Sequence, residues 1–395
     1  MSFESYEKFY DNFSTEEELI KYIEENGLKK KDTLVKGYGF YKDGRRTWES
    51  MKFACKKDLI VIRDKDNIKE IIDIVKNNNT ESKNVLIYLD NKTYEDMNLL
   101  LTELEGYQIR ICYTTGYNRD EKDDVLCTVD EFIGMRAAID YYKSIIESEN
   151  LSPVETIMYV YDIVKSFPYD ETKEDYNLSR NTALVLNNNA MVCLGFCKLM
   201  KQILKELGLN ARLLSVTKHE RIIMKIDDET YGIKGLFVFD PTWDSVKNVS
   251  KYMDKDGKVS YISNPDESKL KDGETKIGEL DGLCLYHYFM IPASSYKKVF
   301  PNEKIVKYET KENIFEEKPN VIKALQEGLA PKPVKKLNLE SVIKMFYKIK
   351  LIEGFPEETI VEQIDELLRI NYGLKDSNEE IIRKVIAEET KSKTM

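Results

Sequence analysis

The chain has 395 residues and a formal net charge of −10 at pH 7, because acidic residues exceed an abundant set of lysines. This length allows two or three domains with cores of their own, and an acidic chain is a poor candidate for nonspecific nucleic-acid binding, which depends on basic surfaces. No apolar run approaches a membrane span, and the first residues do not show a basic region followed by an apolar core. We therefore expect a cytoplasmic protein that has neither a membrane nor a nucleic acid as partner.

The cysteines are scattered through apolar segments, at Cys55, Cys112, Cys127, Cys193, Cys197 and Cys284. Without a secretory signal, free thiols are a better interpretation than a disulfide framework. A zinc site at Cys193 and Cys197 would need two further ligands, and His219 and His287 are the only histidines. We expect no metal and no other cofactor. A structural zinc protein is kept as a third alternative, which metal analysis would test.

Residues 1–148 are predicted to form a small α/β domain. After an amphipathic helical entry within 1–30, short apolar strands alternate with helical segments, which indicates a sheet with partly parallel strands. The strands are expected at 59–62, 85–89, 109–113 and 125–128, and the helices at 67–77, 94–104 and 131–146. This region has no motif of a phosphate site or of an acid/base pair. A structural or recognition role is its simplest interpretation.

Residues 149–310 contain the stretch around which the rest is organised. Pro153 opens a helix, as proline does in a first helical turn. A second helix follows Cys193, with apolar residues on one face and Lys198, Lys201 and other polar residues on the opposite face. Cys193 lies in the first turn, where unpaired N–H groups and the helix dipole stabilise a thiolate.

Three strands are expected after this helix, at 211–216, 221–226 and 236–239, with a turn at Asp227-Asp228 after the second. His219 lies where the second strand begins. Asp240 follows the third strand, and Pro241 ends the strand pairing there. A helix-borne cysteine, a strand-borne histidine and a strand-end carboxylate match a nucleophile, a general base and an orienting group. The polar segment 264–278 is predicted to be a surface loop.

At this point the residues resemble the transglutaminase-like superfamily, which includes transglutaminases, related cysteine proteases and peptide N-glycanases. The resemblance rests on Val-Cys-Leu-Gly-Phe at 192–196, the histidine at the start of a strand, and Asp-Pro-Thr-Trp-Asp at 240–244. It covers roughly residues 150–310 and implies an α+β fold. The implied core is papain-like or transglutaminase-like, with the helix of the cysteine packed on an antiparallel sheet that carries the histidine and the aspartate.

The chain departs from the family pattern at two places beside these motifs. Met191 stands where the family has glycine, and Glu220 and Arg221 stand where the family has a small residue and a tryptophan. Because both places flank the expected site, they bear on substrate preference. Trp243 and Glu220 are therefore candidates for the walls of the substrate cleft.

The resemblance and the order of residues imply thiol acyl transfer. Cys193 would attack an amide carbonyl and form a thioester, His219 would carry the proton, and Asp240 would orient the imidazole. The main-chain N–H of Cys193 is one candidate oxyanion donor, and Asn188, taken from the asparagines at 187–189, is the other. The expected substrate is a protein or peptide amide, which could be hydrolysed, deamidated or cross-linked.

The alternative function is a catalytically inactive scaffold of the same fold that binds other proteins. Retention of the cysteine, the histidine and the aspartate together favours the enzyme, because a relic should have lost at least one of them.

Residues 311–395 are predicted to be a linker followed by a helical module. The segment 331–336 has the proline and lysine content of a linker. Helices are expected at 339–350, at 356–371, and after Ser377, which has Glu380 three residues on as in a capping box. These helices are a candidate surface for a protein partner.

Overall fold

The computed structural model describes Lys21 and the ranges 60–62, 67–77, 84–88, 94–114, 124–170, 182–183, 186, 190–245, 248–257, 259–263, 273–281, 285–308, 320–335, 337–374 and 377–393. These residues fall into two compact units, one within 1–141 and 172–188 and the other within 142–171 and 189–395. The C-terminal helices thus share a unit with the central region, whereas the sequence suggested three domains. Apart from Lys21, the predicted helical entry lies outside the described residues, as does Asn188.

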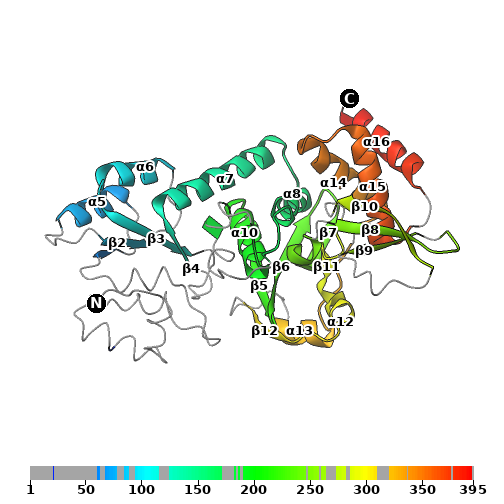
Figure 1. The fold of residues 1–395 in the computed structure, drawn as a ribbon, viewed down its shortest axis with the longest axis horizontal. Coiled ribbons are helices and arrows are strands. Elements are labelled where there is room, and N and C mark those ends of the chain that lie inside the picture. The colour runs from blue at the N-terminus through cyan, green and yellow to red at the C-terminus, as the bar shows by residue number, and fades with distance from the viewer. Residues whose placement is uncertain are drawn as a thin grey trace. The chain divides into compact units, whose positions relative to one another are not determined.

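The first unit is built on a four-stranded sheet. Its elements are β1 (Ile60–Ile62), α5 (Ile68–Asn77), β2 (Asn84–Tyr88), α6 (Tyr94–Glu103), β3 (Gln108–Thr114), β4 (Asp124–Thr128) and α7 (Val129–Ser148), the last continuing into the second unit. β1, β2 and β3 are parallel neighbours, and β4 pairs antiparallel with β3. α5 and α6 lie on one face of this sheet (Figure 1). The predicted alternation of strands and helices, with partly parallel strands, is confirmed.

The core of the second unit is a five-stranded antiparallel sheet with the order β11-β7-β6-β5-β12. Its strands are β5 (Ala211–Val216), β6 (His219–Asp228), β7 (Ile233–Phe239), β11 (Ile291–Pro292) and β12 (Ile305–Tyr308). β6 and β7 are longer than the sequence suggested, and only a four-residue turn, 229–232, separates them. Most of the segment between His219 and Asp240 is therefore paired strand.

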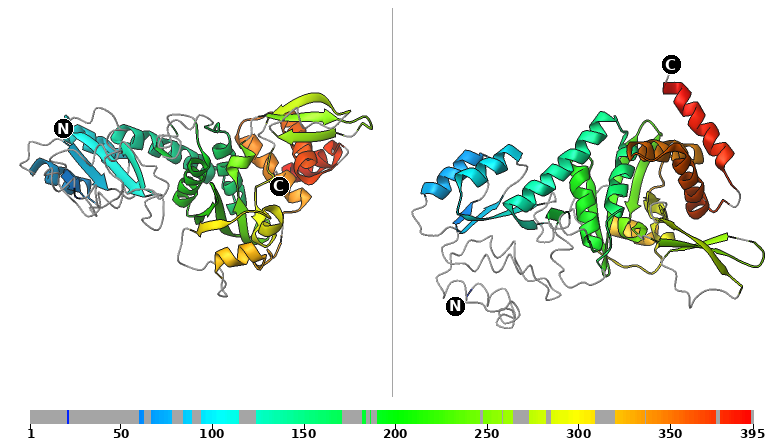
Figure 2. Two further views of the ribbon diagram at one scale, coloured as in Figure 1. Left: turned by 60° about the horizontal axis from the view of Figure 1, so that its bottom comes forward. Right: turned by 45° about the horizontal axis from the view of Figure 1, so that its top comes forward.

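Helices cover both faces of this sheet (Figure 2). On one side are α8 (Pro153–Lys165) and α10 (Cys193–Glu206), which pack on each other and on β6. On the other side, Leu214, Ile223 and Val238 join an apolar cluster with α12 (Tyr296–Val299) and α13 (Val321–Glu327). Because side chains alternate along a strand, neighbouring residues such as Phe239 face α8 instead, and the Phe239 ring lies 6.4 Å from that of Tyr161.

α10 is buried on nearly all sides. The polar face opposite its apolar stripe is buried as well, because the exposed fractions of Lys198, Lys201 and Gln202 are 4%, 1% and 4%. The cause is tertiary, since α10 packs on α8 and on the strands β5 and β6, and both lysines interact with neighbouring groups.

α8 begins with a capping box that extends into other elements. The Ser152 hydroxyl accepts a hydrogen bond from the Glu155 N–H, and the Ser152 N–H donates to Glu155 Oε2 at 2.8 Å. Glu155 is only 4% exposed. Its carboxylate also accepts from the Tyr231 hydroxyl at 2.8 Å and from Lys348 Nζ at 2.7 Å. One carboxylate therefore joins α8, the β6–β7 turn and the C-terminal helices.

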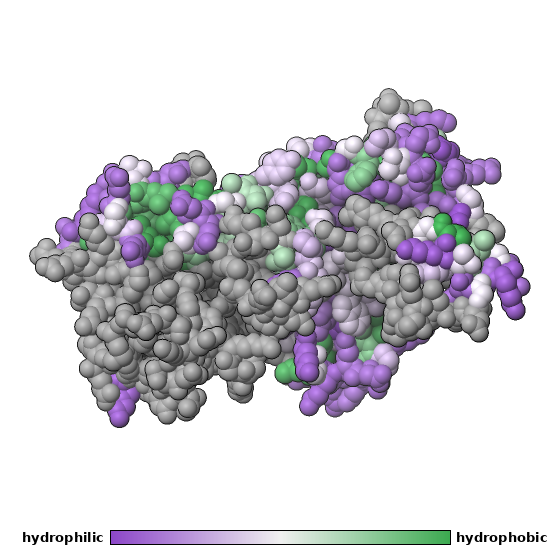
Figure 3. All heavy atoms as spheres, in the orientation of Figure 1, coloured by the Kyte–Doolittle hydropathy of each residue, from purple (hydrophilic) through white to green (hydrophobic). Residues whose placement is uncertain are grey.

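The C-terminal helices are α14 (Leu339–Ile352), α15 (Glu357–Tyr372) and α16 (Glu379–Lys393). They pack on one another, and α14 packs on α8. The preceding linker is also docked, because Val334 N–H donates to Lys234 O at 2.8 Å and Pro333 lies over Gly235. A Cβ at Gly235 would come within 2.7 Å of Pro333 Cβ, so glycine is required at this close approach. Hydrophilic side chains cover the outward face of the C-terminal helices (Figure 3).

A buried ion network fixes α14 to α8. Asp162 lies 3.2 Å from Lys165 Nζ and 3.0 Å from Lys350 Nζ, and it accepts from the Tyr286 hydroxyl at 2.6 Å. Lys350 Nζ also lies 2.6 Å from Glu353. Burial of these ions is tolerated because each has partners of opposite charge within hydrogen-bond distance.

The second unit also contains a three-stranded antiparallel sheet of β8 (Asn248–Met253), β9 (Val259–Ser263) and β10 (Thr275–Asp281). The prediction of a surface loop over 264–278 is wrong from Thr275 onward, because β10 pairs there with β8. Among the helices that the structure describes, none is long and apolar enough to cross a membrane.

Candidate active site

Cys193 is the first residue of α10, and its position is fixed from both sides. Val192 is the N-cap, and valine has no polar side chain that could accept from the first-turn N–H groups. Immediately upstream, Met191 N–H donates to Pro168 O at 3.0 Å, and Asp170 N–H donates to Met191 O at 2.8 Å. These bonds hold the residues before α10 against the segment that follows α8. The N-terminus of α10 has no side-chain cap.

His219 lies at the end of a hairpin. It is the first residue of β6 and pairs with Val216 across the two-residue turn Thr217-Lys218. Lys218 has a φ of 62°, a left-handed conformation that costs a residue with a side chain about 1 kcal/mol. This tight turn brings the imidazole to the edge of the sheet, where its side chain is 13% exposed.

Asp240 is fully buried and uses both carboxylate oxygens. Its Oδ2 lies 2.7 Å from His219 Nε2. Its Oδ1 accepts from the Trp243 N–H at 3.1 Å, so Asp240 caps the short helix α11 (Pro241–Asp244). Its own N–H donates to Tyr288 O at 3.1 Å. The carboxylate is thus held in one orientation by the helix start that Pro241 imposes.

The structure places the His219 imidazole within hydrogen-bond distance of Asp240 and close enough to Cys193 for the two side chains to interact electrostatically. Burial lowers the pKa of His219, but hydrogen bonds to Asp240 and Cys193 and their negative charges outweigh burial and raise the pKa to about 9. Nε2 faces Asp240, which leaves Nδ1 for Cys193. The imidazole is consequently protonated at pH 7.

Arg221 is a residue of this site that sequence reasoning noted only as a departure from the family. Its side chain is fully buried, and its Nε lies 2.8 Å from Asp240 Oδ2. The Nε–H does not point at that oxygen, so the contact is an ion pair rather than a hydrogen bond. Its two other nitrogens bind both carboxylate oxygens of Glu303, which lies after α12.

Aromatic rings enclose this guanidinium, which lies 3.9 Å from the Phe300 ring centroid and 4.7 Å from that of Trp243. Burial lowers the pKa of Arg221, and the charges of Asp240 and Glu303 raise it above the ordinary value.

The two cleft candidates occupy different places. Trp243 is 40% exposed, and its ring stacks on His219 with a centroid distance of 5.4 Å and an interplanar angle of 28°. Glu220 is 7% exposed and accepts from the Ser215 hydroxyl at 2.7 Å. Because strand residues alternate, Glu220 points to the sheet face opposite that of His219 and Arg221. Trp243 therefore offers an aromatic surface beside the site, whereas Glu220 lies inside the unit.

Cys197 lies one turn beyond Cys193 and is fully buried. Burial, with nearby negative charges, raises the pKa of its thiol well above the ordinary value. A neutral buried thiol packs as a small apolar side chain, so Cys197 belongs to the core of the second unit.

A second carboxylate, Asp244, lies at the other end of α11 from Asp240. Its Oδ2 accepts from the Tyr161 hydroxyl at 2.6 Å and from the Tyr288 N–H at 3.0 Å. Burial raises the pKa of Asp244 to about 7 despite these hydrogen bonds. The second aspartate of the Asp-Pro-Thr-Trp-Asp motif was the only sequence signal for this role.

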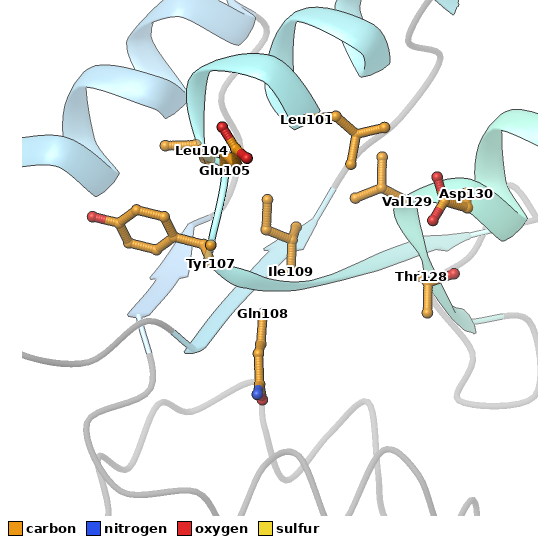
Figure 4. A pocket seen from close by; sticks show the side chains of 10 residues that line it. Leu101, Leu104, Glu105, Tyr107, Gln108, Ile109, Thr128, Val129 and Asp130 are labelled. Carbon is orange, nitrogen blue, oxygen red and sulfur yellow. The ribbon is translucent and has the colours of Figure 1, made fainter.

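A separate cavity of about 410 Å³ lies in the first unit (Figure 4). Leu101 and Leu104 of α6, with Ile109 and Val129, form its apolar lining, and Glu105, Tyr107, Gln108 and Asp130 are among its polar residues. None of the predicted site residues lines it, and its lining has no cysteine or histidine.

Within the described ranges, no three His, Cys, Asp or Glu side chains gather as metal ligands would. No protein-family model matches the chain, and no curated protein or solved structure matches it either.

Proposed function

We propose that this protein is a cysteine-dependent enzyme that transfers or hydrolyses acyl groups of protein or peptide amides. One observation carries the proposal: His219 lies beside Cys193 at an uncapped helix N-terminus, and its Nε2 is 2.7 Å from the buried carboxylate of Asp240. A nucleophile, an acid/base group and an orienting group are arranged in this way in thiol acyl transfer.

The pair begins the reaction as Cys193 thiolate and His219 imidazolium. The thiolate attacks the amide carbonyl, and the main-chain N–H of Cys193 donates to the tetrahedral oxyanion. The imidazolium then gives its proton to the leaving amine, the C–N bond breaks, and a thioester forms. Water or a second amine attacks the thioester, His219 takes up its proton, and the Cys193 thiolate leaves. Asp240 stabilises the imidazolium throughout.

The proposed fold is the transglutaminase-like or papain-like arrangement of the α+β class. It is supported by the helix of Cys193 packed on an antiparallel sheet, with His219 beginning one strand and Asp240 directly following the next. The exposed face of Trp243 next to the imidazole suits an apolar portion of a peptide, which favours a polypeptide substrate.

Iodoacetamide labelling of single cysteines, read by peptide mass mapping across pH, tests the proposal. At pH 7 the thiolate of Cys193 should label at least about tenfold faster than Cys127, which is 2% exposed and serves as the internal control. His219→Ala and Asp240→Asn should each slow labelling at pH 7 by about tenfold or more, because each removes part of the ion pair.

Amide hydrolysis and incorporation of a fluorescent primary amine into a glutamine-rich protein then separate water from amine as acceptor. If Cys193 labels no faster than Cys127 and neither substitution matters, the site is unused. The inactive protein-binding scaffold would then be the better explanation.

A further inference from the structure

Arg221 and Glu303 form a charge pair behind Asp240 that the mechanism above does not use. Asp240 Oδ2 lies 2.7 Å from His219 Nε2 and 2.8 Å from Arg221 Nε, so one oxygen faces two cations. Arg221 is fully buried and bound at two nitrogens by Glu303, whose side chain is 22% exposed. The roles proposed for Cys193, His219 and Asp240 do not by themselves require Arg221 or Glu303.

The energetic consequence follows from charge. A guanidinium stays protonated at all accessible pH, so Arg221 always competes with the imidazolium for the charge of Asp240. Glu303 opposes Arg221, because its carboxylate neutralises most of the guanidinium charge. In a buried site these charges are weakly screened, so each of them acts on the proton affinity of His219.

We propose that Arg221 and Glu303 are positioning residues that divide the charge of Asp240 between two cations and thereby set the proton affinity of His219. This inference rests on the proposed function. Through Glu303, the segment after α12 then influences the protonation of His219.

Opposite changes are expected for the two members of the pair. Arg221→Met removes a cation from Asp240 and leaves Glu303 as a negative charge, and both effects favour the imidazolium. Glu303→Gln removes a negative charge and frees the guanidinium for Asp240, and both effects disfavour the imidazolium. The midpoint of His219 protonation should rise by about 1 pH unit in the first variant and fall by about 1 pH unit in the second.

Proton NMR of the imidazole Cε1–H measures this directly, because the chain has only two histidines. His287→Gln assigns the His219 signal in the full-length protein. Arg221→Lys keeps the positive charge and should leave the midpoint near that of the wild type. Arg369→Met is the matched control, since Arg369 lies on α15 and pairs at 2.9 Å with Asp365 of the same helix.

Unchanged midpoints in folded Arg221→Met and Glu303→Gln variants, or changes of the same sign, would overturn the inference. Asp240→Asn distinguishes failure of the tuning role from failure of the proposed triad. If it lowers the His219 midpoint while the pair variants do nothing, only the tuning role fails. If it leaves the midpoint unchanged, the proposed triad fails as well.

Discussion

The Tyr161 hydroxyl lies 2.6 Å from Asp244 Oδ2 and 3.0 Å from the main-chain oxygen of Asp240. A single phenol of α8 therefore contacts both ends of the short helix that begins at the proposed catalytic aspartate. Tyr161 is fully buried, and burial together with the charge of Asp244 raises the pKa of its hydroxyl well above the ordinary value. Helix α8 thus holds the Asp240 end of the site through a neutral donor.

Tyr161→Phe should lower the free energy of unfolding by about 1–3 kcal/mol, because it leaves a buried carboxylate oxygen with one donor fewer. Denaturant unfolding at pH 7 measures the loss. Tyr252→Phe is the matched control: Tyr252 is fully buried, and its hydroxyl has no hydrogen-bond partner among the described residues. Removal of that hydroxyl should be neutral or stabilising, and an equal loss in both variants would contradict the assigned role of Tyr161.

The loss of stability caused by Asp244→Asn should decrease as pH rises from 5 to 8. Burial raises the pKa of Asp244 to about 7, so the folded wild type holds this proton more tightly than the unfolded chain. Wild-type stability therefore falls with pH between the ordinary pKa and about 7, and the asparagine variant is spared this fall. Thermal unfolding at several pH values measures the difference.

Asp162→Asn is the contrast for this experiment. Burial raises the pKa of Asp162, but the charges of Lys165 and Lys350 outweigh it and lower the pKa below the ordinary value. The stability that Asp162 contributes is present above the ordinary pKa and is lost only in acid. The cost of this substitution should consequently stay constant between pH 5 and 8, unlike that of Asp244→Asn.

His219→Gln should cost the most stability near pH 6 and progressively less as pH rises through 9. The pKa of His219 is raised from 6.5 to about 9, so its contribution is complete below 6.5 and is lost above 9. At about 1.4 kcal/mol for each pKa unit, the contribution is on the order of 3 kcal/mol. Urea unfolding at fixed pH values measures it, and a Cys193→Ala background reveals the part that depends on the thiolate. A cost independent of pH would contradict the raised pKa.

Trp243 should report the protonation of His219. The chain has two tryptophans, and Trp48→Phe leaves Trp243 alone as the fluorophore. A stacked imidazolium quenches indole emission more than a neutral imidazole does, so emission should increase with a midpoint near the pKa of about 9. Asp240→Asn should move this midpoint to lower pH. Emission that does not change between pH 6 and 10 would contradict the stacked geometry.

Lys350→Met should destabilise the protein by about 3–5 kcal/mol, because it leaves Asp162 and Glu353 buried without their shared cation. Lys344→Met on the same helix is the control. Lys344 pairs with Glu340 at 2.8 Å where the carboxylate is 56% exposed, and such surface pairs contribute less than about 1 kcal/mol. Similar losses of Tm in the two variants would argue against the buried network as the link between α14 and α8.

Most of the local structure could be predicted from the sequence. Hydrophobic periodicity located α5, α8, α10 and α14, because an apolar stripe must be buried whatever the neighbouring elements are. It missed β8 to β10, whose polar strands alternate too weakly for a local signal. It also gave no signal that Lys198 and Lys201 are buried, because the burial of a second helix face depends on elements distant in the chain.

The order of Cys193, His219 and Asp240 predicted a shared site, and the structure places His219 beside the other two side chains, whereas their roles remain a proposal. Arg221 could be noticed only as an unusual neighbour of the histidine. Its pairing with Glu303 spans 82 residues, and no spacing rule connects two such positions. Asn188 lies outside the described residues, so its place as an oxyanion donor remains a prediction.

The shared use of Glu155 limits how this chain can be divided. Its carboxylate completes the start of α8 and at the same time binds the ammonium of Lys348, 193 residues away. A fragment that stops near residue 310, where the composition changes, would lose Lys348 and Lys350 of α14, which pair with Glu155 and Asp162 of α8. Any piece of the chain that keeps these ion pairs must therefore contain α14 together with α8.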